Sequence, residues 1–499
     1  MSVPSKPGPP ENSRLRRTFG FRLKHFLPGG EAFSLRRFSI TEAALLLIVA
    51  YLTSRGLGVV RQTLLNMLFG TGPEANAYYA AAYLPETLFD LVAGGALVHA
   101  FIPVFLSYEK DHGQREVWRL TSLVFNVMLV ALTLLVLVGE FLTPAFVYHW
   151  LVPGYAPAEQ EMTVVLTRIL LLQPLFLGLG TVITAALNSK RQFLLPAVSI
   201  AVYNVGVIAG LSVSFLLPGV GIYGPTGGIL LAVALQVLVM LPALLKQEAR
   251  YSFTWDLKHP GLREILRLLV PNMLAVALTA CAPIIDTAFI SYMSDSASLA
   301  AQRNAYMLFA LPLALVAQAV GQAALPRLAS LATARKYVRL RQTLLKVLGT
   351  SLVFSILSAL ALYLFGKPGI HVLFQHGAFD SHSAYVTDVA LLGYALALPG
   401  QAAASLLILT FYALKNGLVP FCTTIVAFLA HLGALVFFVR ILTGSSQIIA
   451  VPLALAADGI ASTLLLSALL WLVFLPARVR NDLSLQRLAR KRAYQKSLL

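Results

Sequence analysis

Four charged side chains lie inside the first two long apolar stretches of the chain. Arg55 and Arg61 occupy the first stretch, and Glu86 and Asp90 occupy the second. Counted at about 1.5 Å per residue from the turn between the stretches, Arg61 and Glu86 fall at the same depth, and Arg55 matches Asp90 in the same way. Because charges inside a membrane are costly, we expect two ion pairs. Such pairs either only hold the hairpin together or line a wet cavity and exchange partners with a charged substrate or ion.

The whole chain has the composition of an integral membrane protein. Of its 499 residues, 58% are hydrophobic and 12% are charged. A spanning helix needs about 20 apolar residues, and a backbone in lipid must satisfy its own hydrogen bonds, which favours helices. We therefore expect about twelve transmembrane helices, at 40–69, 77–106, 118–148, 161–187, 193–216, 222–245, 262–292, 299–325, 343–365, 384–413, 418–440 and 448–475.

A polar connection divides these helices six and six, which is typical of transporters built from two similar halves. The predicted fold is all-α, with two six-helix bundles. Prolines inside several spans favour a cavity-forming transporter over a passive anchor, because proline bends a helix. Basic cytoplasmic tails are predicted at 1–38 and 476–499. The N-terminal bundle is predicted at 39–246 and the C-terminal bundle at 262–475, with a cytoplasmic linker at 247–261 between them.

The basic residues are unevenly distributed. Most of the 38 Lys and Arg residues fall in the tails and in loops that alternation of the spans places on one side. The positive-inside rule then places both termini in the cytoplasm. The net charge of +17 follows from this topology and faces anionic lipid, so we expect membrane lipid and no nucleic acid as a partner. Cys281 and Cys422 lie in apolar stretches, where neither is placed for a disulfide or metal site.

Several short motifs resemble one known family. They keep their order and spacing over most of 40–440: SRGLG at 54–58, FGTG at 69–72, AFIP at 100–103, RQF at 191–193, LPRL at 325–328 and VLFQHGAF at 372–379. Together they are similar to the MurJ (MviN-type) lipid II flippases of the multidrug/oligosaccharidyl-lipid/polysaccharide exporter superfamily. The resemblance implies two helical bundles around a central cavity, which passes a lipid-linked sugar headgroup by alternating access while the lipid tail stays in the bilayer.

The resemblance also assigns roles to residues. Arg55 and Arg61 match basic cavity positions of the family, and a guanidinium can bind a diphosphate with two hydrogen bonds. Glu86 and Asp90 would be their exchange partners. Asp286 matches a position linked in some members to sodium; by itself, this carboxylate could hold a cation or be protonated.

The sequence also departs from the family pattern. Neutral residues stand at two positions where the family usually has acids, Gln62 and Asn76. Phe89 and Asp90 replace a frequent basic pair. Met307 aligns with an expected basic residue, for which Arg303, one turn earlier, can substitute. The family usually has fourteen spans. A polyprenyl-diphosphate-linked sugar is therefore the expected substrate class, with the peptidoglycan precursor lipid II as its favoured member.

The remaining polar residues of the spans indicate no catalysis. Asp458 is a second carboxylate that either approaches Asp286 or makes a helix–helix hydrogen bond. His99 and His431 are isolated, and we expect them to pack or to line the cavity. The sequence has no Walker loop, HExxH or GxSxG motif, so we expect no enzyme activity, no cofactor and no metal. Membrane potential or a Na⁺ or H⁺ gradient would supply the energy.

Two other functions are open. A cation-coupled multidrug antiporter would use the carboxylates, whereas an unpaired arginine would disfavour cationic drugs. An assembly protein would recruit cell-wall synthesis enzymes through its basic tails. A membrane glycosyltransferase is disfavoured, since no extended loop could hold a nucleotide-sugar site. The predicted location is the bacterial cytoplasmic membrane, where peptidoglycan biosynthesis takes up its lipid-linked precursors.

Overall fold

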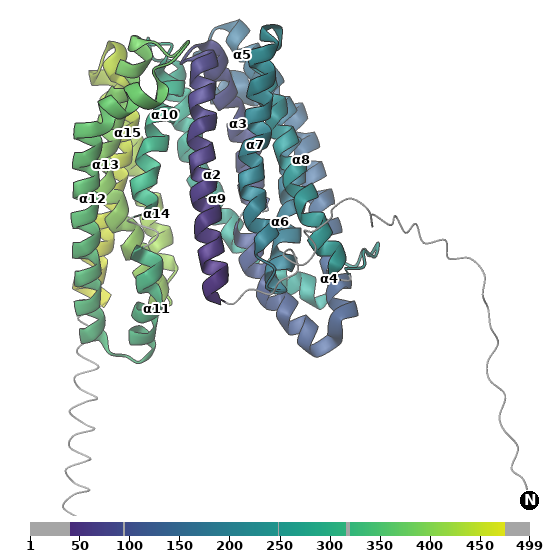
Figure 1. Cartoon of the computed structure of the whole chain (residues 1–499). Helices are drawn as coiled ribbons and strands as arrows, with labels where there is room; N and C mark the ends of the chain where they lie inside the picture. The colour runs from purple at the N-terminus through teal and green to yellow at the C-terminus, as the bar shows by residue number, and fades with distance from the viewer. Residues whose placement is uncertain (1–39, 93–94, 248, 316–319, 475–499) are drawn as a thin grey trace, which may run out of the picture.

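The computed structural model describes residues 40–92, 95–247, 249–315 and 320–474, so the two predicted tails lie outside it. Within these ranges the ordered elements are helical, as predicted, with no strand (Figure 1). We call the end at which α2 begins the lower end, and the end at which α2 meets α3 the upper end.

The first half of the chain forms seven α-helices and two short helical turns. They are α2 (Ile40–Phe69), α3 (Pro73–Val92), α4 (Gly95–Phe146), η1 (Val147–Leu151), α5 (Pro157–Leu170), α6 (Gln173–Ser189), α7 (Leu194–Leu216), η2 (Pro218–Val220) and α8 (Tyr223–Lys246).

Local sequence explains several of these boundaries. α2 ends at Phe69 because Gly70 adopts a φ of 56°, a conformation that glycine tolerates and that caps a helix. α4 is two helices joined at Gly113, whose φ is 82°. Pro157 opens α5, where its missing N–H costs no helical hydrogen bond.

The second half follows after a polar connection at the lower end. Its elements are α9 (Pro260–Ser291), α10 (Ser298–Leu313), α11 (Val320–Thr333), α12 (Tyr337–Phe374), α13 (Ser381–Ala413), α14 (Leu418–Ile441), η4 (Gly444–Ile449), α15 (Ala450–Ala468) and η5 (Leu469–Phe474).

The expected spans fall mainly on these helices. Eight helical runs in the described ranges are long and apolar enough to cross a membrane, which makes this a multi-pass membrane protein. The number twelve stays a prediction. Some expected spans carry several charges or include residues outside the described ranges. One helical run, Ala100–Leu151, contains the Gly113 turn and so holds parts of two expected spans.

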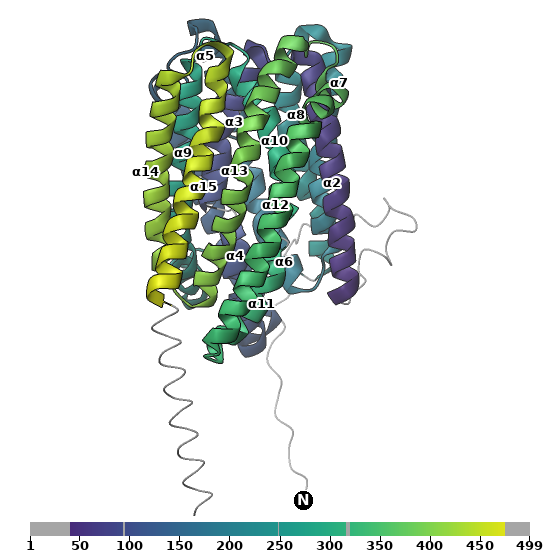
Figure 2. The same cartoon turned by 90° about the vertical axis from the view of Figure 1, so that its left-hand side faces the viewer.

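The helices gather into two groups side by side (Figures 1 and 2). In one, α7 packs on α8 and α2, and α4 on α6; in the other, α13 packs on α12 and α15, and α15 on α14. α9 is the exception, because it packs more on α4 and α3 than on α14 and α10. Its Leu262, Ile265 and Leu269 share a core with Phe101 and Phe105 of α4. The predicted boundary at 247–261 therefore stays a prediction, and α9 connects the two groups.

Candidate functional site

A polar cavity lies where the two groups of helices meet. Its volume is about 610 Å³, and its walls come from α3, α9, α10, α13, α14 and α15. Six side chains of the wall are acidic, basic or imidazole: Glu86, Asp90, Asp286, Arg303, His431 and Asp458. Because α3 belongs to one group and α13–α15 to the other, a movement between the groups changes the shape of this cavity.

Arg303 on α10 supplies a cation to the wall. Its guanidinium carbon lies 4.0 Å from the centre of the Tyr83 ring on α3, a cation–π distance. Its strong electrostatic partners include Glu86. Its buried Nε has no hydrogen-bond partner among the described residues. Arg303 is thus a half-buried cation with unused capacity to donate, in the wall of the cavity.

Glu86 and Asp90 line the cavity from α3, but the ion pairs expected from the sequence are wrong. Among the described residues, no ion pair joins Arg61 to Glu86 or Arg55 to Asp90. The reason is helix packing, because α2 packs on α7 while α3 packs on α5 and α9. Equal depth on consecutive helices does not make them neighbours.

Arg55 and Arg61 are not among the described residues that line the cavity. Arg55 is exposed on α2. Arg61 is half-buried, with its guanidinium carbon 5.9 Å from the centre of the Tyr203 ring on α7. Arg61 interacts electrostatically with Glu86, although more weakly than Arg303 does. The two arginines therefore lie on α2 outside the wall of the cavity, and their role toward a substrate stays a prediction.

Asp286 on α9 has a direct partner on α14. Its Oδ1 lies 2.8 Å from Nε2 of His431, and the two side chains are only 13% and 5% exposed. The backbone of Ala454 on α15 also interacts electrostatically with the imidazole. The histidine expected to be a packing or cavity residue thus joins α9 to α14 and α15.

Asp458 on α15 lies close to this pair without bonding to Asp286. Nε2 of Gln401 donates to its Oδ2 at 2.7 Å and to the carbonyl of Leu455 at 3.0 Å. His431 interacts electrostatically with both carboxylates. Asp458 therefore makes the helix–helix hydrogen bond that the sequence left as an alternative, while it also faces the cavity.

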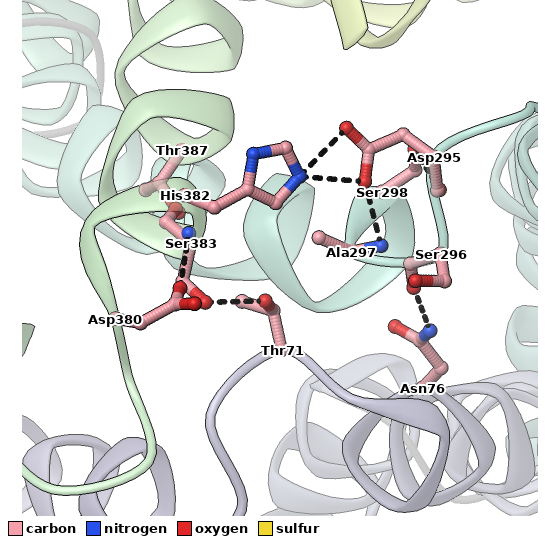
Figure 3. A network of polar contacts seen from close by, with 10 residues as sticks. All are labelled: Thr71, Asn76, Asp295, Ser296, Ala297, Ser298, Asp380, His382, Ser383 and Thr387. Carbon is pink, nitrogen blue, oxygen red and sulfur yellow. Dashed lines mark hydrogen bonds and ion pairs between the residues drawn. The ribbon is translucent and has the colours of Figure 1, made fainter.

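Hydrogen bonds close the upper end between the two groups of helices (Figure 3). Thr71 and Ser383 share a bond of 2.7 Å. Asn76 donates to the carbonyl of Ser296 and accepts from the N–H of Ala300 at 2.9 Å. These bonds connect the α2–α3 turn to the starts of α10 and α13.

The same end holds an ion pair outside the spans. His382 Nε2 lies 3.1 Å from Oδ2 of Asp295. Burial alone would raise the pKa of the Asp295 carboxyl, but hydrogen bonds from Ser445, Ala297 and His382 outweigh it and hold the pKa below its usual value. Asp380 caps α13 by accepting from the N–H of Ser383 at 2.8 Å, which lowers its pKa.

A cluster of buried amides lies just below this network. Gln62 Nε2 donates to Oδ1 of Asn304 at 2.8 Å, and Asn66 Nδ2 donates to the same oxygen at 3.0 Å. Gln62 also hydrogen bonds to the Tyr79 hydroxyl. Two departures from the family pattern, Gln62 and Asn76, therefore lie on contacts between the groups, where a neutral amide both donates and accepts. Phe89 and Met307 are not among the described cavity-lining residues.

Sequence reasoning missed Gln401, Tyr83 and the partner of His431. Gln401 and Tyr83 carried no signal, since single polar or aromatic residues are common in spans. His431 carried a weak one, because a lone histidine in an apolar helix needs a polar partner. Chemically, the wall offers one cation for an anionic group, carboxylates that accept from hydroxyls, and a protonatable pair.

Comparisons with known proteins agree with this geometry. Residues 65–497 match the family model described as "Lipid II flippase MurJ". The lipid II flippase MurJ of Burkholderia cenocepacia is 30% identical over 376 residues, 73% of this chain and 72% of that protein. The lipid II flippase MurJ of Thermosipho africanus is 26% identical over 397 residues, 79% of each chain.

Solved structures with the same fold include a lipid II flippase MurJ in an inward closed conformation. It superposes with a TM-score of 0.72 at 25% identity, over 85% of this chain and 87% of that one. An inward-facing multidrug resistance transporter of the MATE family gives a TM-score of 0.72 at 14% identity, over 87% and 99%; that likeness concerns the fold alone. The family model and the Burkholderia relative decide the assignment: this chain belongs to the MurJ lipid II flippase family.

Proposed function

We propose that this protein is a flippase that translocates a polyprenyl-diphosphate-linked sugar across the bacterial cytoplasmic membrane by alternating access, with lipid II as the favoured substrate. The observation that carries the proposal is Arg303, a half-buried cation on the wall of a cavity of about 610 Å³, whose Nε has no hydrogen-bond partner among the described residues. That volume lies within the usual range for sites that bind small molecules.

In this proposal Arg303 binds the diphosphate. A guanidinium donates through a planar fork that matches phosphate oxygens, and Glu86 would give up its interaction with Arg303 when the substrate arrives. The sugar hydroxyls would bond to Asp90 and Gln302, which also line the cavity. Arg61 and Arg55, beside the cavity on α2, would meet the headgroup as it enters.

The closed upper end supports an assignment of direction. The basic loops and both tails would lie at the lower end, so the positive-inside rule makes that end cytoplasmic. The headgroup would enter the cavity from the cytoplasm. Breaking the upper contacts at Thr71, Asn76 and Asn304 would then release it outside. Asp286 and Asp458 would couple the movement to an ion, Na⁺ or H⁺.

A second candidate is a cation-coupled multidrug antiporter. It is favoured by four carboxylates in one cavity, namely Glu86, Asp90, Asp286 and Asp458, and by the fold shared with the MATE transporter. Arg303 argues against it, because a cation repels cationic drugs. Recruitment of cell-wall synthesis enzymes by the tails is a further proposal about partners, and those residues lie outside the described structure.

A complementation experiment tests the proposal. The gene is expressed in a bacterium whose own lipid II flippase can be depleted, and survival after depletion is scored. We expect wild type to restore growth and Arg303→Gln not to. In a strain without its own drug pumps, we expect no efflux of a cationic dye. Dye efflux together with failed complementation would favour the antiporter and refute the flippase.

A further inference from the structure

We infer that Asp286 and His431 form a proton-binding site, and that the protein exchanges protons, not sodium ions, for its substrate. The inference rests on the proposed function, because it names the coupling ion of the same cavity. It depends on three observations: the contact between the two side chains, the other partner of the imidazole, and the helices that the pair joins.

The contact itself requires a proton. An ionised carboxylate only accepts hydrogen bonds, and an imidazole nitrogen without hydrogen also only accepts. Asp286 Oδ1 and His431 Nε2 are 2.8 Å apart, a hydrogen-bond distance. The structure is therefore compatible with a proton on Nε2 or on the carboxyl group, and incompatible with its absence from both.

The second partner of the imidazole accounts for the other ring proton. The backbone of Ala454 on α15 also interacts with the ring and favours its protonated form. A neutral imidazole carries its hydrogen on one nitrogen only. The ring can therefore donate to both a carbonyl and the carboxylate only as an imidazolium; otherwise the proton shared with the carboxyl sits on Asp286. Loss of one proton leaves two acceptors facing each other inside the protein.

An imidazole next to the carboxylate also disfavours sodium. Hard cations select oxygen ligands, whereas imidazole suits transition metals. Here Oδ1 of Asp286 is already occupied by a nitrogen, and nearby Asp458 bonds to Gln401.

The pair is placed where its charge can affect the conformation. α9 packs mainly on α3 and α4, while α14 packs on α15, so the Asp286–His431 bond connects the two groups of helices. Above it, Ile290 of α9, Leu435 of α14 and Ala454 of α15 share one apolar core. Loss of the proton would separate α9 from α14 below this core and so favour opening of the upper end.

Other charges of the cavity face the pair and set its response to pH. They come from α3, α10, α13 and α15; α4 contributes no described residue to the wall. These titratable or charged groups are Tyr83, Glu86, Asp90, Arg303, Tyr306, Tyr394 and Asp458. Proton release to the lower end and uptake from the upper end would move one proton inward for each outward passage of the lipid-linked sugar.

A spectroscopic titration tests the site without any transport. Protein with ¹⁵N-labelled histidines in lipid nanodiscs is titrated between about pH 5 and pH 9, around the usual histidine range, and His431→Gln identifies the His431 signal. We expect that signal to titrate, and Asp286→Asn to move its midpoint by about one pH unit or more. A signal that does not titrate, or a midpoint unchanged by Asp286→Asn, would overturn the inference.

Vesicles test the coupling. Wild type is reconstituted with lipid II, potassium and valinomycin hold the membrane potential at zero, and a pH or sodium gradient is imposed. We expect acid at the upper end to speed flipping about threefold or more, a sodium gradient to have no effect, and His431→Gln to remove the response. His149→Gln, at an exposed histidine of η1, is the matched control and should keep it.

The titration and the vesicle assay together distinguish failure of the proton site from failure of the flippase proposal. Flipping that responds to sodium, or that responds fully to pH in His431→Gln, would overturn the proton site while the flippase proposal stands. A titrating His431 coupled to Asp286, in a protein that flips no lipid II under any gradient, would support the proton site and refute the proposed function.

Discussion

Arg303 is the residue on which the chemistry of the cavity depends most. Among the described lining residues it is the one arginine or lysine, whereas four carboxylates share the wall. Without substrate, the Tyr83 ring at 4.0 Å and the charge of Glu86 stabilise it. A diphosphate offers oxygens that a guanidinium binds more strongly than it binds a ring face, so substrate binding would exchange one set of partners for another.

Replacing Arg303 should therefore weaken binding of the headgroup. A hydrogen bond to a charged group contributes about 1.5–3 kcal/mol, so we expect Arg303→Gln to weaken affinity for lipid II by about tenfold to a hundredfold. Arg303→Lys should recover only part, because an ammonium lacks the planar fork. Native mass spectrometry measures both, with Arg440→Gln at an exposed arginine of α14 as control. Unchanged affinity in Arg303→Gln would remove the proposed role.

The hydrogen bonds of Asp295 should make the stability of the folded protein depend on pH in acid. Its pKa is lowered in the folded protein from an ordinary value of 3.8. The stabilisation is therefore complete above that value and is lost as the pH falls through the lower folded pKa. We expect the melting temperature of wild type to drop below about pH 4, and Asp295→Asn to flatten this part of the curve. Asp256→Asn, in the exposed linker, should leave the drop in place; an identical drop in Asp295→Asn would contradict the prediction.

The cavity could be predicted from the sequence only in part. The apolar spans were enough to place Asp286 and Asp458 inside the membrane region, whereas Arg303 was selected through the resemblance to the family. The pairing of Arg61 with Glu86 failed, because depth does not reveal which helices pack together. The partnership of Asp286 with His431 joins residues 145 positions apart, and no spacing rule connects them.

Among the structural elements, the turns of the upper end bring the two groups of helices together. Gly70 and Gly377 have φ values of 56° and 61°, and the N–H of Ala378 donates to the carbonyl of Met67 at 2.9 Å. A Cβ on Gly377 would lie 2.3 Å from that carbonyl, and one on Gly154 would lie 2.4 Å from the carbonyl of Ser291. Glycine is needed at these positions because the backbones approach so closely.

Gly154→Ala should consequently favour an open upper end. The methyl group collides with the backbone at Ser291, and overpacking of this kind costs about 1–3 kcal/mol. Spin labels at Tyr223 and Tyr385, exposed at the starts of α8 and α13, report the separation by pulsed electron spin resonance in a Cys281→Ser, Cys422→Ser background. We expect a population with longer distances.

Gly227→Ala is the control for this measurement, because no atom lies within 4 Å of the added methyl. It should leave the distances as in wild type. A Gly154→Ala protein whose distances match wild type would show that the closed upper end does not depend on this approach.

The helices themselves were the most predictable part of the fold. Runs of apolar residues indicated which segments enter the membrane, but several expected spans, such as 161–187, cover two helices of the structure. The contact of α9 with α3 and α4 was not predictable, because it depends on side chains such as Leu262 and Phe101 that look like any other apolar residue in a span.

Taken as a whole, the molecule has two groups of helices side by side (Figure 1), with a closed upper end and a charged cavity where the groups meet. The hydrogen bonds at Thr71, Asn76 and Asn304 are individually weak, since such bonds average about 0.6 kcal/mol in membranes. A set of weak contacts can be broken and remade during a transport cycle.

Flipping of fluorescent lipid II in vesicles, read by quenching from the outside, tests the transport function most directly. We predict that wild type moves the lipid across the bilayer when a membrane potential or a pH gradient is imposed. The flipping rate of Arg303→Gln should be lower than that of wild type by a factor of about ten or more. Wild-type vesicles that flip no more lipid than empty ones would contradict the proposed function. Equal rates for wild type and Arg303→Gln would contradict the role given to the cavity.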